Sequence, residues 1–169
     1  MNEQSIQRAL YSIYDNYEYK LFNVYIFGME TDFFAISKSG YAIEIEIKIS
    51  ESDFKKDFKK KEKHRRYSDK SMKQKPNRFM YACPHGLIDI SEVPEYAGLI
   101  YIGTYDYNSK IIKQPPLLHK NKPMDNIKFV KDLLTKYYYR YQAIQRKYEI
   151  KNWNMSDRQL NLFNPDSTW

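Results

Sequence analysis

Hydrophobic and charged residues alternate most regularly between Tyr41 and Ile49. Successive side chains of a β-strand point to opposite faces of its sheet. As a strand, this segment therefore places its four isoleucines on one face and Glu44, Glu46 and Lys48 on the other. From alternation alone, the charged face fits a solvated surface of an antiparallel sheet as well as it fits a functional site.

The preceding segment, Thr31–Ser37, is a second predicted strand, and Gly40 eases the reversal between the two. The pattern therefore predicts a hairpin. If the two strands pair, Asp32 can reach the carboxylate of Glu46. Two converging carboxylates beside a lysine can hold a divalent ion next to a phosphate.

The rest of the chain alternates between helical and strand periodicity. Helical spacing marks residues 3–17, 50–67 and 125–148, and apolar or aromatic runs predict strands at 19–29, 78–83, 98–103 and 110–113. Ser50 or Ser52 is expected to cap the second helix. This order predicts one α/β domain over residues 1–150, with a central mixed sheet flanked by helices. A flexible polar tail, 151–169, follows it.

The last predicted helix is amphipathic, so we expect its apolar positions to pack on the domain core. These positions are Ile127, Val130, Leu133, Leu134, Tyr137, Tyr138, Tyr141 and Ile144.

Composition narrows the function classes. The net charge of +7 favours a polyanionic partner such as DNA. The single cysteine, Cys83, excludes an internal disulfide and any multi-cysteine zinc site. The sequence shows neither an apolar run of membrane-spanning length nor an apolar signal core. We therefore expect a cytoplasmic protein without a membrane partner.

Several segments together resemble the PD-(D/E)XK nuclease superfamily, and most closely the bacterial DNA-repair endonucleases of the MmcB type. The matching pieces, spread over roughly residues 20–140, are Thr31–Ile36, Glu46–Ser50, Ser52–Phe54 with Asp57, Arg78–Pro84 and Ala97–Ile100. Thr31 replaces the proline that names the motif. The resemblance implies a restriction-endonuclease-like core and a metal-dependent phosphodiesterase.

Residue roles follow only where the motif matches. The resemblance implies that Asp32, Glu46 and Lys48 are catalytic and that Asp32, Glu46 and the carbonyl of Ile47 hold Mg²⁺, with Mn²⁺ as a substitute. Lys48 would orient the water or neutralise the phosphate. Two points stay open. The extra acid of the family's first helix is Glu3 or Glu18, and Glu44 is a further site acid or a strand-face charge paired with Lys48.

A run of basic residues follows the motif. The residues expected to contact DNA are Lys55, Lys59, Lys60, Lys63, Arg65 and Arg66. Such a run is usually a solvated helix face, but beside a nuclease site it can follow phosphates.

The tail holds a second motif. Gln159, Leu160, Leu162 and Phe163 resemble the pentapeptide by which bacterial replication and repair proteins bind the sliding clamp. Leucine and phenylalanine anchors suit apolar pockets, and a short tail can fold onto such a groove. The alternative is that these side chains pack back on the domain.

The sequence thus predicts a Mg²⁺- or Mn²⁺-dependent deoxyribonuclease, a monomer or homodimer, tethered to the sliding clamp in DNA replication, repair or recombination. The clamp motif suggests a bacterium, or a phage that uses its host's clamp. The alternative is a catalytically inactive adaptor or inhibitor that binds DNA or the clamp.

Overall fold

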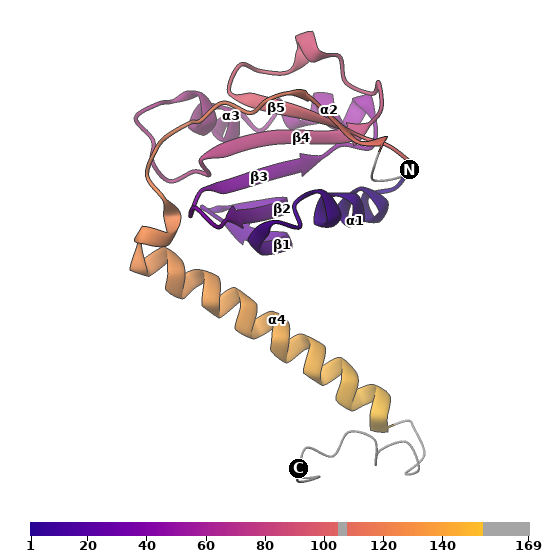
Figure 1. Cartoon of the computed structure of the whole chain (residues 1–169), viewed down its shortest axis with the longest axis vertical. Coiled ribbons are helices and arrows are strands. Elements are labelled where there is room, and N and C mark those ends of the chain that lie inside the picture. Colours follow the sequence, from indigo (N-terminus) through magenta and orange to yellow (C-terminus); the bar gives the residue numbers. More distant parts are fainter. Residues whose placement is uncertain (105–107, 154–169) are drawn as a thin grey trace. The chain divides into compact units, whose positions relative to one another are not determined.

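The computed structural model describes residues 1–104 and 108–153, and side chains as far as residue 148 in the last helix. Within these ranges, six strands form one sheet whose spatial order follows the chain (Figure 1). The strands are β1 (Tyr17–Ile26), β2 (Met29–Ser37), β3 (Ala42–Ile47), β4 (Arg78–Pro84), β5 (Ala97–Ile102) and β6 (Lys110–Lys113). The helices are α1 (Glu3–Ile13), α2 (Glu51–Asp57), α3 (Lys61–Ser68) and α4 (Ile127–Trp153), with short 3-10 helices η1 (Ile90–Glu92) and η3 (Pro123–Asp125).

The sheet is mixed, as predicted. β1, β2 and β3 pair antiparallel, β3, β4 and β5 pair parallel, and β6 returns antiparallel to β5. The predicted hairpin is confirmed, with Phe33 of β2 opposite Ile45 of β3. Asp32 and Glu46 lie one position beyond this pair, so they are on neighbouring strands and on the same face of the sheet.

Apolar side chains cover both faces of the sheet. One buried cluster joins α1 to the sheet through residues that include Leu10, Phe33 and Ile45. The other joins α2 and α3 to β4 and β5 through Phe54, Tyr67 and residues around them. β3 lies between these layers, and all six of its residues are buried.

The predicted helix over 50–67 is two helices in the structure. Ser50 caps α2 as expected, because its Oγ accepts a hydrogen bond from the Asp53 amide. The helix ends at Asp57, and α3 begins at Lys61. On α2, Phe54 lies in the core, whereas Phe58, the C-cap residue, is 39% exposed.

The chain divides into two compact units between Asn126 and Ile127, so α4 begins the second unit, and the domain over 1–150 stays a prediction. Of the side chains expected in the core, Leu133 is buried. Five others are 52–69% exposed, and their packing on the domain core stays a prediction: Ile127, Leu134, Tyr138, Tyr141 and Ile144.

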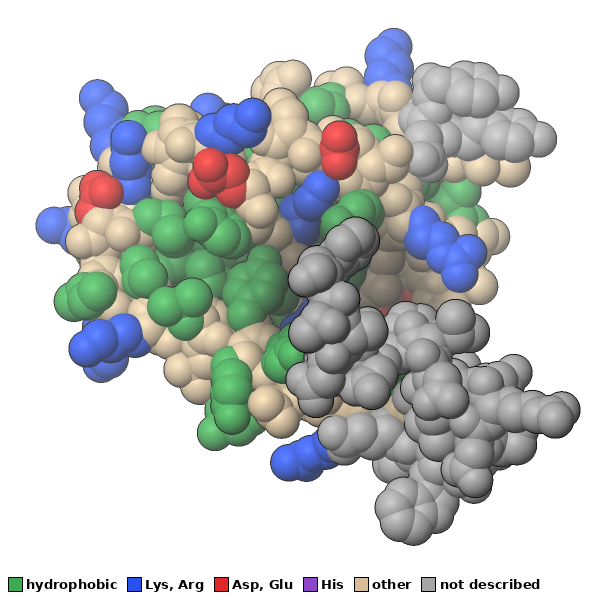
Figure 2. All heavy atoms as spheres, turned by 60° about the horizontal axis from the view of Figure 1, so that its bottom comes forward, with side chains coloured by type: hydrophobic (Ala, Val, Ile, Leu, Met, Phe, Trp, Pro, Cys, Tyr) green, Lys and Arg blue, Asp and Glu red, His purple; other side chains and the backbone are tan. Residues whose placement is uncertain are grey.

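The surface is mixed in character. On the face drawn in Figure 2, hydrophobic side chains form a patch, and Lys and Arg side chains stand around its margin. None of the helices in the described ranges combines the length and the apolar character that crossing a membrane requires. The expected clamp motif, Gln159 to Phe163, lies outside the described residues.

Candidate functional site

Charged side chains are buried between β3 and the helices α2 and α3. Glu44 is 0%, Glu46 3% and Lys48 4% exposed. The solvated-surface interpretation of this strand is therefore wrong. The reason is topological: the connection from β3 to its parallel neighbour β4 carries α2 and α3, and helices in such connections cover the face of the sheet.

Ion pairs join the buried acids to two lysines. Lys48 Nζ lies 3.3 Å from Glu46 Oε2 and 3.3 Å from Asp57 Oδ1. Lys63 Nζ, from α3, lies 2.6 Å from Glu46 Oε1 and 3.6 Å from Asp57 Oδ1. The Tyr81 hydroxyl donates to Asp57 Oδ2 over 3.0 Å. We call Glu44, Glu46, Lys48, Asp57 and Lys63 the buried charge cluster.

Opposing effects set the pKa values of Lys48 and Asp57. Burial lowers the pKa of Lys48, but the carboxylates of Glu46 and Asp57 outweigh it and raise that pKa overall. Burial raises the pKa of Asp57, but Lys63 and Lys48 outweigh it, and the net pKa is lowered. Both groups are therefore held in their charged forms.

Glu44 differs from the other acids of the cluster. Its Oε1 accepts a 2.6 Å hydrogen bond from the Tyr67 hydroxyl, whereas its Oε2 has no hydrogen-bond partner among the residues that the structure describes. Burial raises the pKa of this carboxyl to about 7, although Lys63 and Tyr67 favour the ionised form. Within the described residues Glu44 does not pair with Lys48, and the charge that acts most strongly on it is that of Lys63.

Asp32 stands at the edge of the cluster. Its Oδ2 accepts a 2.7 Å hydrogen bond from the Ile47 amide. Burial, and then the negative charge of Glu46, raises the pKa of Asp32 to about 6, and Glu3 contributes in the same direction. Glu3 lies in the first turn of α1, whereas Glu18 lies in β1. Of the two candidates, Glu3 is therefore the one that lies in the first helix, and its charge acts on Asp32.

Together with Asp32, the buried charge cluster has an excess of negative charge. The four carboxylates are those of Asp32, Glu44, Glu46 and Asp57. Only two buried ammonium groups face them, those of Lys48 and Lys63. The exposed Lys60 adds a third at the rim, 3.4 Å from Asp57. Burying unbalanced charge is costly, and a bound cation or a proton offsets it. Burial is the main cause of the raised pKa values of Asp32 and Glu44, and the neighbouring carboxylates add to it.

These donors suit a hard cation. Mg²⁺ takes oxygen ligands, keeps several waters and is commonly held by one or two carboxylates. Asp32 and Glu46 supply two carboxylates on adjacent strands, and the Ile47 carbonyl is a third possible donor. Among the described residues no three His, Cys, Asp or Glu side chains form a metal-binding group. A metal here would be held by two carboxylates, and one of them, that of Glu46, is also paired with Lys63.

The basic run divides into exposed and buried members. Lys55, Lys59 and Lys60 are exposed on α2 and the turn after it. Arg65 is also exposed and pairs with Glu62 over 2.6 Å. These residues are accessible at the surface, and their contacts with DNA phosphates stay a prediction.

Two residues of the run have other contacts. Lys63 is 3% exposed, so it lies in the charge cluster and not on the expected DNA-binding surface. Arg66 is half-buried and donates to the Phe27 carbonyl in the β1–β2 turn. A cavity of about 610 Å³ lies between this turn and the start of α3. Its lining is Gly28, Met29, Glu30, Lys59, Lys60, Lys61, Glu62, Lys63 and Arg66.

His64 links α3 to the end of α2 through its ring nitrogens. Its Nε2 lies 2.9 Å from the Asp57 carbonyl oxygen, and its Nδ1 contacts the Tyr96 hydroxyl. A carbonyl only accepts, so Nε2 donates, and neutral His64 accepts from Tyr96 at Nδ1. The ring also stacks on Phe58. These contacts fix the segment from which Asp57 reaches the cluster.

Sequence reasoning missed the roles of Lys63, Tyr67 and Tyr81. Lys63 and Tyr67 are four residues apart, the spacing that places two side chains on one helix face. This spacing could have identified the pair, but Lys63 lies in a run of lysines and does not stand out from them. Tyr81 lies opposite Glu46 in the β3–β4 register.

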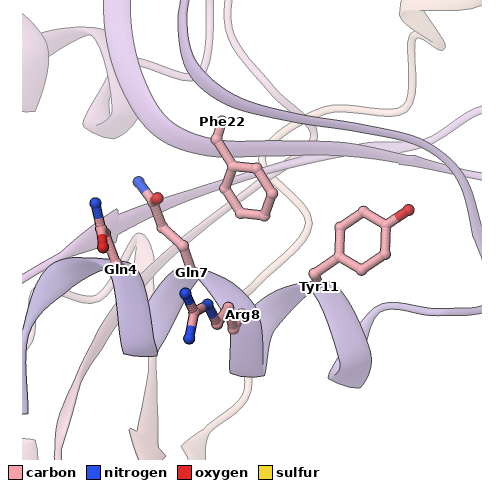
Figure 3. Close-up of a pocket in the computed structure, with 5 residues that line it drawn as sticks. All are labelled: Gln4, Gln7, Arg8, Tyr11 and Phe22. Carbon is pink, nitrogen blue, oxygen red and sulfur yellow. The ribbon is translucent and has the colours of Figure 1, made fainter. Parts of the chain in front are cut away.

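A second cavity, of about 450 Å³, lies between α1 and β1. Gln7 and Tyr11 rise on either side of the Phe22 ring, with Gln4 and Arg8 beside them (Figure 3). None of these five residues belongs to the buried charge cluster.

Comparison with known proteins supports the fold. No protein-family model matches the chain, and no curated protein matches it. The structure is similar to that of a protein of unknown function from Silicibacter pomeroyi, with a TM-score of 0.63 and 20% sequence identity. The match covers 86% of this chain and 92% of that one. The α/β architecture with a mixed sheet is therefore shared with a natural protein.

Proposed function

We propose that the chain is a Mg²⁺- or Mn²⁺-dependent DNA nuclease with a restriction-endonuclease-like core. The observation that carries this proposal is the position of Asp32, Glu46 and Lys48. They converge on one face of the sheet, in a buried cluster that has more carboxylates than ammonium groups. The resemblance of the sequence motif to PD-(D/E)XK nucleases gives the same residues these roles.

Each residue has a distinct task in this proposal. Asp32 and Glu46 hold the metal, which when bound lowers the pKa of water and offsets phosphate charge. Lys48 stays protonated between Glu46 and Asp57 and presents its charge to the scissile phosphate. Asp57 positions Lys48 and touches no reacting atom. The exposed lysines of α2 and the α2–α3 turn bind the flanking DNA backbone.

A cleavage assay tests the proposal. Single-stranded, duplex, flapped and branched DNA are incubated with Mg²⁺ or Mn²⁺ and the full chain, or with Asp32→Asn, Glu46→Gln or Lys48→Met. Glu51→Gln, an exposed acid of α2, is the matched control. We expect cleavage by the native protein and the control, and loss of at least about 100-fold in each site variant, as for one transition-state contact. An intact DNA panel with both metals would refute the nuclease.

One contact favours a second candidate, a DNA-binding protein without turnover. Lys63 Nζ lies 2.6 Å from Glu46 Oε1, so an internal cation already balances one expected metal ligand. In this case Mg²⁺ leaves the thermal stability unchanged, and DNA binding persists without cleavage. Magnesium-dependent stabilisation that Asp32→Asn abolishes would rule this candidate out.

The clamp-binding motif supports a tether to the replication machinery. Tethering raises the local concentration of the protein at DNA. We expect the full chain to bind a bacterial sliding clamp and a chain ending before Asp157 to lose that binding. Equal clamp affinity of the full and shortened chains would exclude the motif.

A further inference from the structure

Five of the seven large apolar residues that α4 exposes lie at the a and d positions of a heptad repeat; the other two, Tyr138 and Tyr139, lie at e and f. With Ile127 as position a, the a and d positions through residue 148 are all aliphatic or aromatic. They are Ile127, Leu134, Tyr141 and Tyr148 at a, and Val130, Tyr137 and Ile144 at d. Five of them, Ile127, Leu134, Tyr141, Ile144 and Tyr148, expose 52–69% of their surface. An uninterrupted a/d repeat over three heptads is the pattern of a coiled-coil seam.

We propose that α4 pairs with α4 of a second copy of this chain in a parallel, in-register coiled coil. The seam is self-complementary in this register, because each a residue meets its own copy. Position g of one helix then faces the following e position of the other. Arg140 thus faces Gln145, and no like charges meet there.

The exposed area is sufficient for a specific interface. Large apolar side chains such as aromatic residues bury roughly 150–250 Å² each. Five side chains that are more than half exposed therefore offer on the order of 500 Å² per helix, or about 1,000 Å² for the pair. This is the lower range of specific protein interfaces.

Charge sets the salt dependence of this association. Residues 127–148 carry six Lys or Arg and one Asp. Two such helices repel one another, so screening by salt strengthens the dimer. Binding of the same helix to DNA weakens with salt, so the two associations are readily told apart.

Sedimentation equilibrium of the full chain, without DNA, tests the proposal. We expect a native dimer, at twice the 20.5 kDa of the chain, that tightens as salt rises. Leu134→Glu with Tyr141→Glu raises the dissociation constant at least about 100-fold, because each change buries a charge. The matched control, Thr135→Glu with Gln142→Glu, places the same charges at b positions and stays dimeric.

A cysteine variant gives a second, independent readout. In the parallel register, Leu134→Cys forms a disulfide between the two copies on mild oxidation, and the only other cysteine, Cys83, is buried. A monomeric native chain at tens of micromolar, or a seam variant that stays dimeric, would overturn the proposal. A dimer that does not cross-link at this position would overturn the parallel register. Neither result depends on nuclease activity.

Discussion

Lys63 Nζ lies 2.6 Å from Glu46 Oε1, while Lys48 Nζ lies 3.3 Å from the other oxygen of the same carboxylate. Glu46 is therefore held between a lysine of its own strand end and a lysine of α3. A metal that binds Glu46 must share this carboxylate with Lys63. The ion pair thus connects the stability of the fold to the occupancy of the proposed metal site.

Replacing Lys63 with methionine should destabilise the protein strongly. The change keeps the apolar length of the side chain but leaves buried carboxylates without their cation, which typically costs about 3–5 kcal/mol. Urea denaturation at pH 8 measures this loss. The exposed Lys61→Met is the matched control and should change the free energy of unfolding by less than about 0.5 kcal/mol.

The same variant reports on metal binding. With Lys63 gone, Glu46 Oε1 has lost its cation and Lys48 balances the carboxylate from the other oxygen only, so 10 mM Mg²⁺ should stabilise Lys63→Met more than the native chain. Equal stabilisation of the two proteins would show that the metal and Lys63 do not share this carboxylate.

Glu44→Gln should stabilise the protein at high pH. The folded-state pKa of Glu44 is raised to about 7 from 4.5, so the folded protein binds a proton more tightly than the unfolded chain. The contribution of Glu44 to the free energy of unfolding is therefore complete below about pH 4.5 and is lost as pH rises through 7. Glutamine mimics the protonated form and should gain on the order of 3 kcal/mol at pH 8.

Urea denaturation of the native protein and Glu44→Gln between pH 4.5 and 8.5 tests this pH dependence. The advantage of Glu44→Gln should shrink steadily toward zero at the acidic end. A gain that does not vary with pH would mean that Glu44 is not the titrating group, and Glu51→Gln should show no such trend.

Lys75→Met should loosen α3. The Lys75 ammonium is buried and donates to the carbonyls of Arg66, Tyr67 and Asp69 over 3.1, 3.3 and 2.6 Å. It therefore satisfies carbonyls at the end of the helix, where a cation is favoured. Leaving them unpaired costs on the order of 3 kcal/mol. The urea midpoint measures the loss, and the exposed Lys73→Met is the control.

Changing three exposed lysines to alanine, Lys55, Lys59 and Lys60, should lower the affinity for DNA and make that affinity less dependent on salt concentration. Each lost phosphate contact lowers the slope of log affinity against log salt by about 0.9. Fluorescence anisotropy from 50 to 200 mM salt measures both effects. The control changes three exposed lysines elsewhere, Lys38, Lys110 and Lys120. Identical slopes for the two triples would place the DNA on another surface.

Much of the fold was predictable because the signals were local. The Asp32–Glu46 hairpin followed from period-two alternation and a glycine turn, and the Ser50 cap followed from residue type. The break between Asp57 and Lys61 was not predictable in this way. The segment is rich in helix-forming lysine, and the contacts of Lys63 and Tyr67 with the sheet are long-range.

Burial of the site was also outside the reach of local pattern. Alternation places Glu44 and Glu46 on one face but does not say what covers that face. In the sequence, Lys63 looks like the solvated lysines around it, and only its tertiary contacts show that it is buried. The a/d residues of α4 were a similar case: their spacing predicts an apolar seam but not the surface that the seam meets.

The match between strand order and chain order has a consequence for folding. The β1–β2–β3 meander closes through short turns, whereas pairing of β3 with β4 must wait for residues 48–77, which include α2 and α3. We therefore expect the meander to form first, with Glu44 and Glu46 in contact with water until α3 packs on the sheet and brings Lys63 to them. On this expectation, docking of α3 buries the acids and assembles the site together. We therefore expect refolding to be faster at mildly acidic pH, where Glu44 takes up its proton before burial.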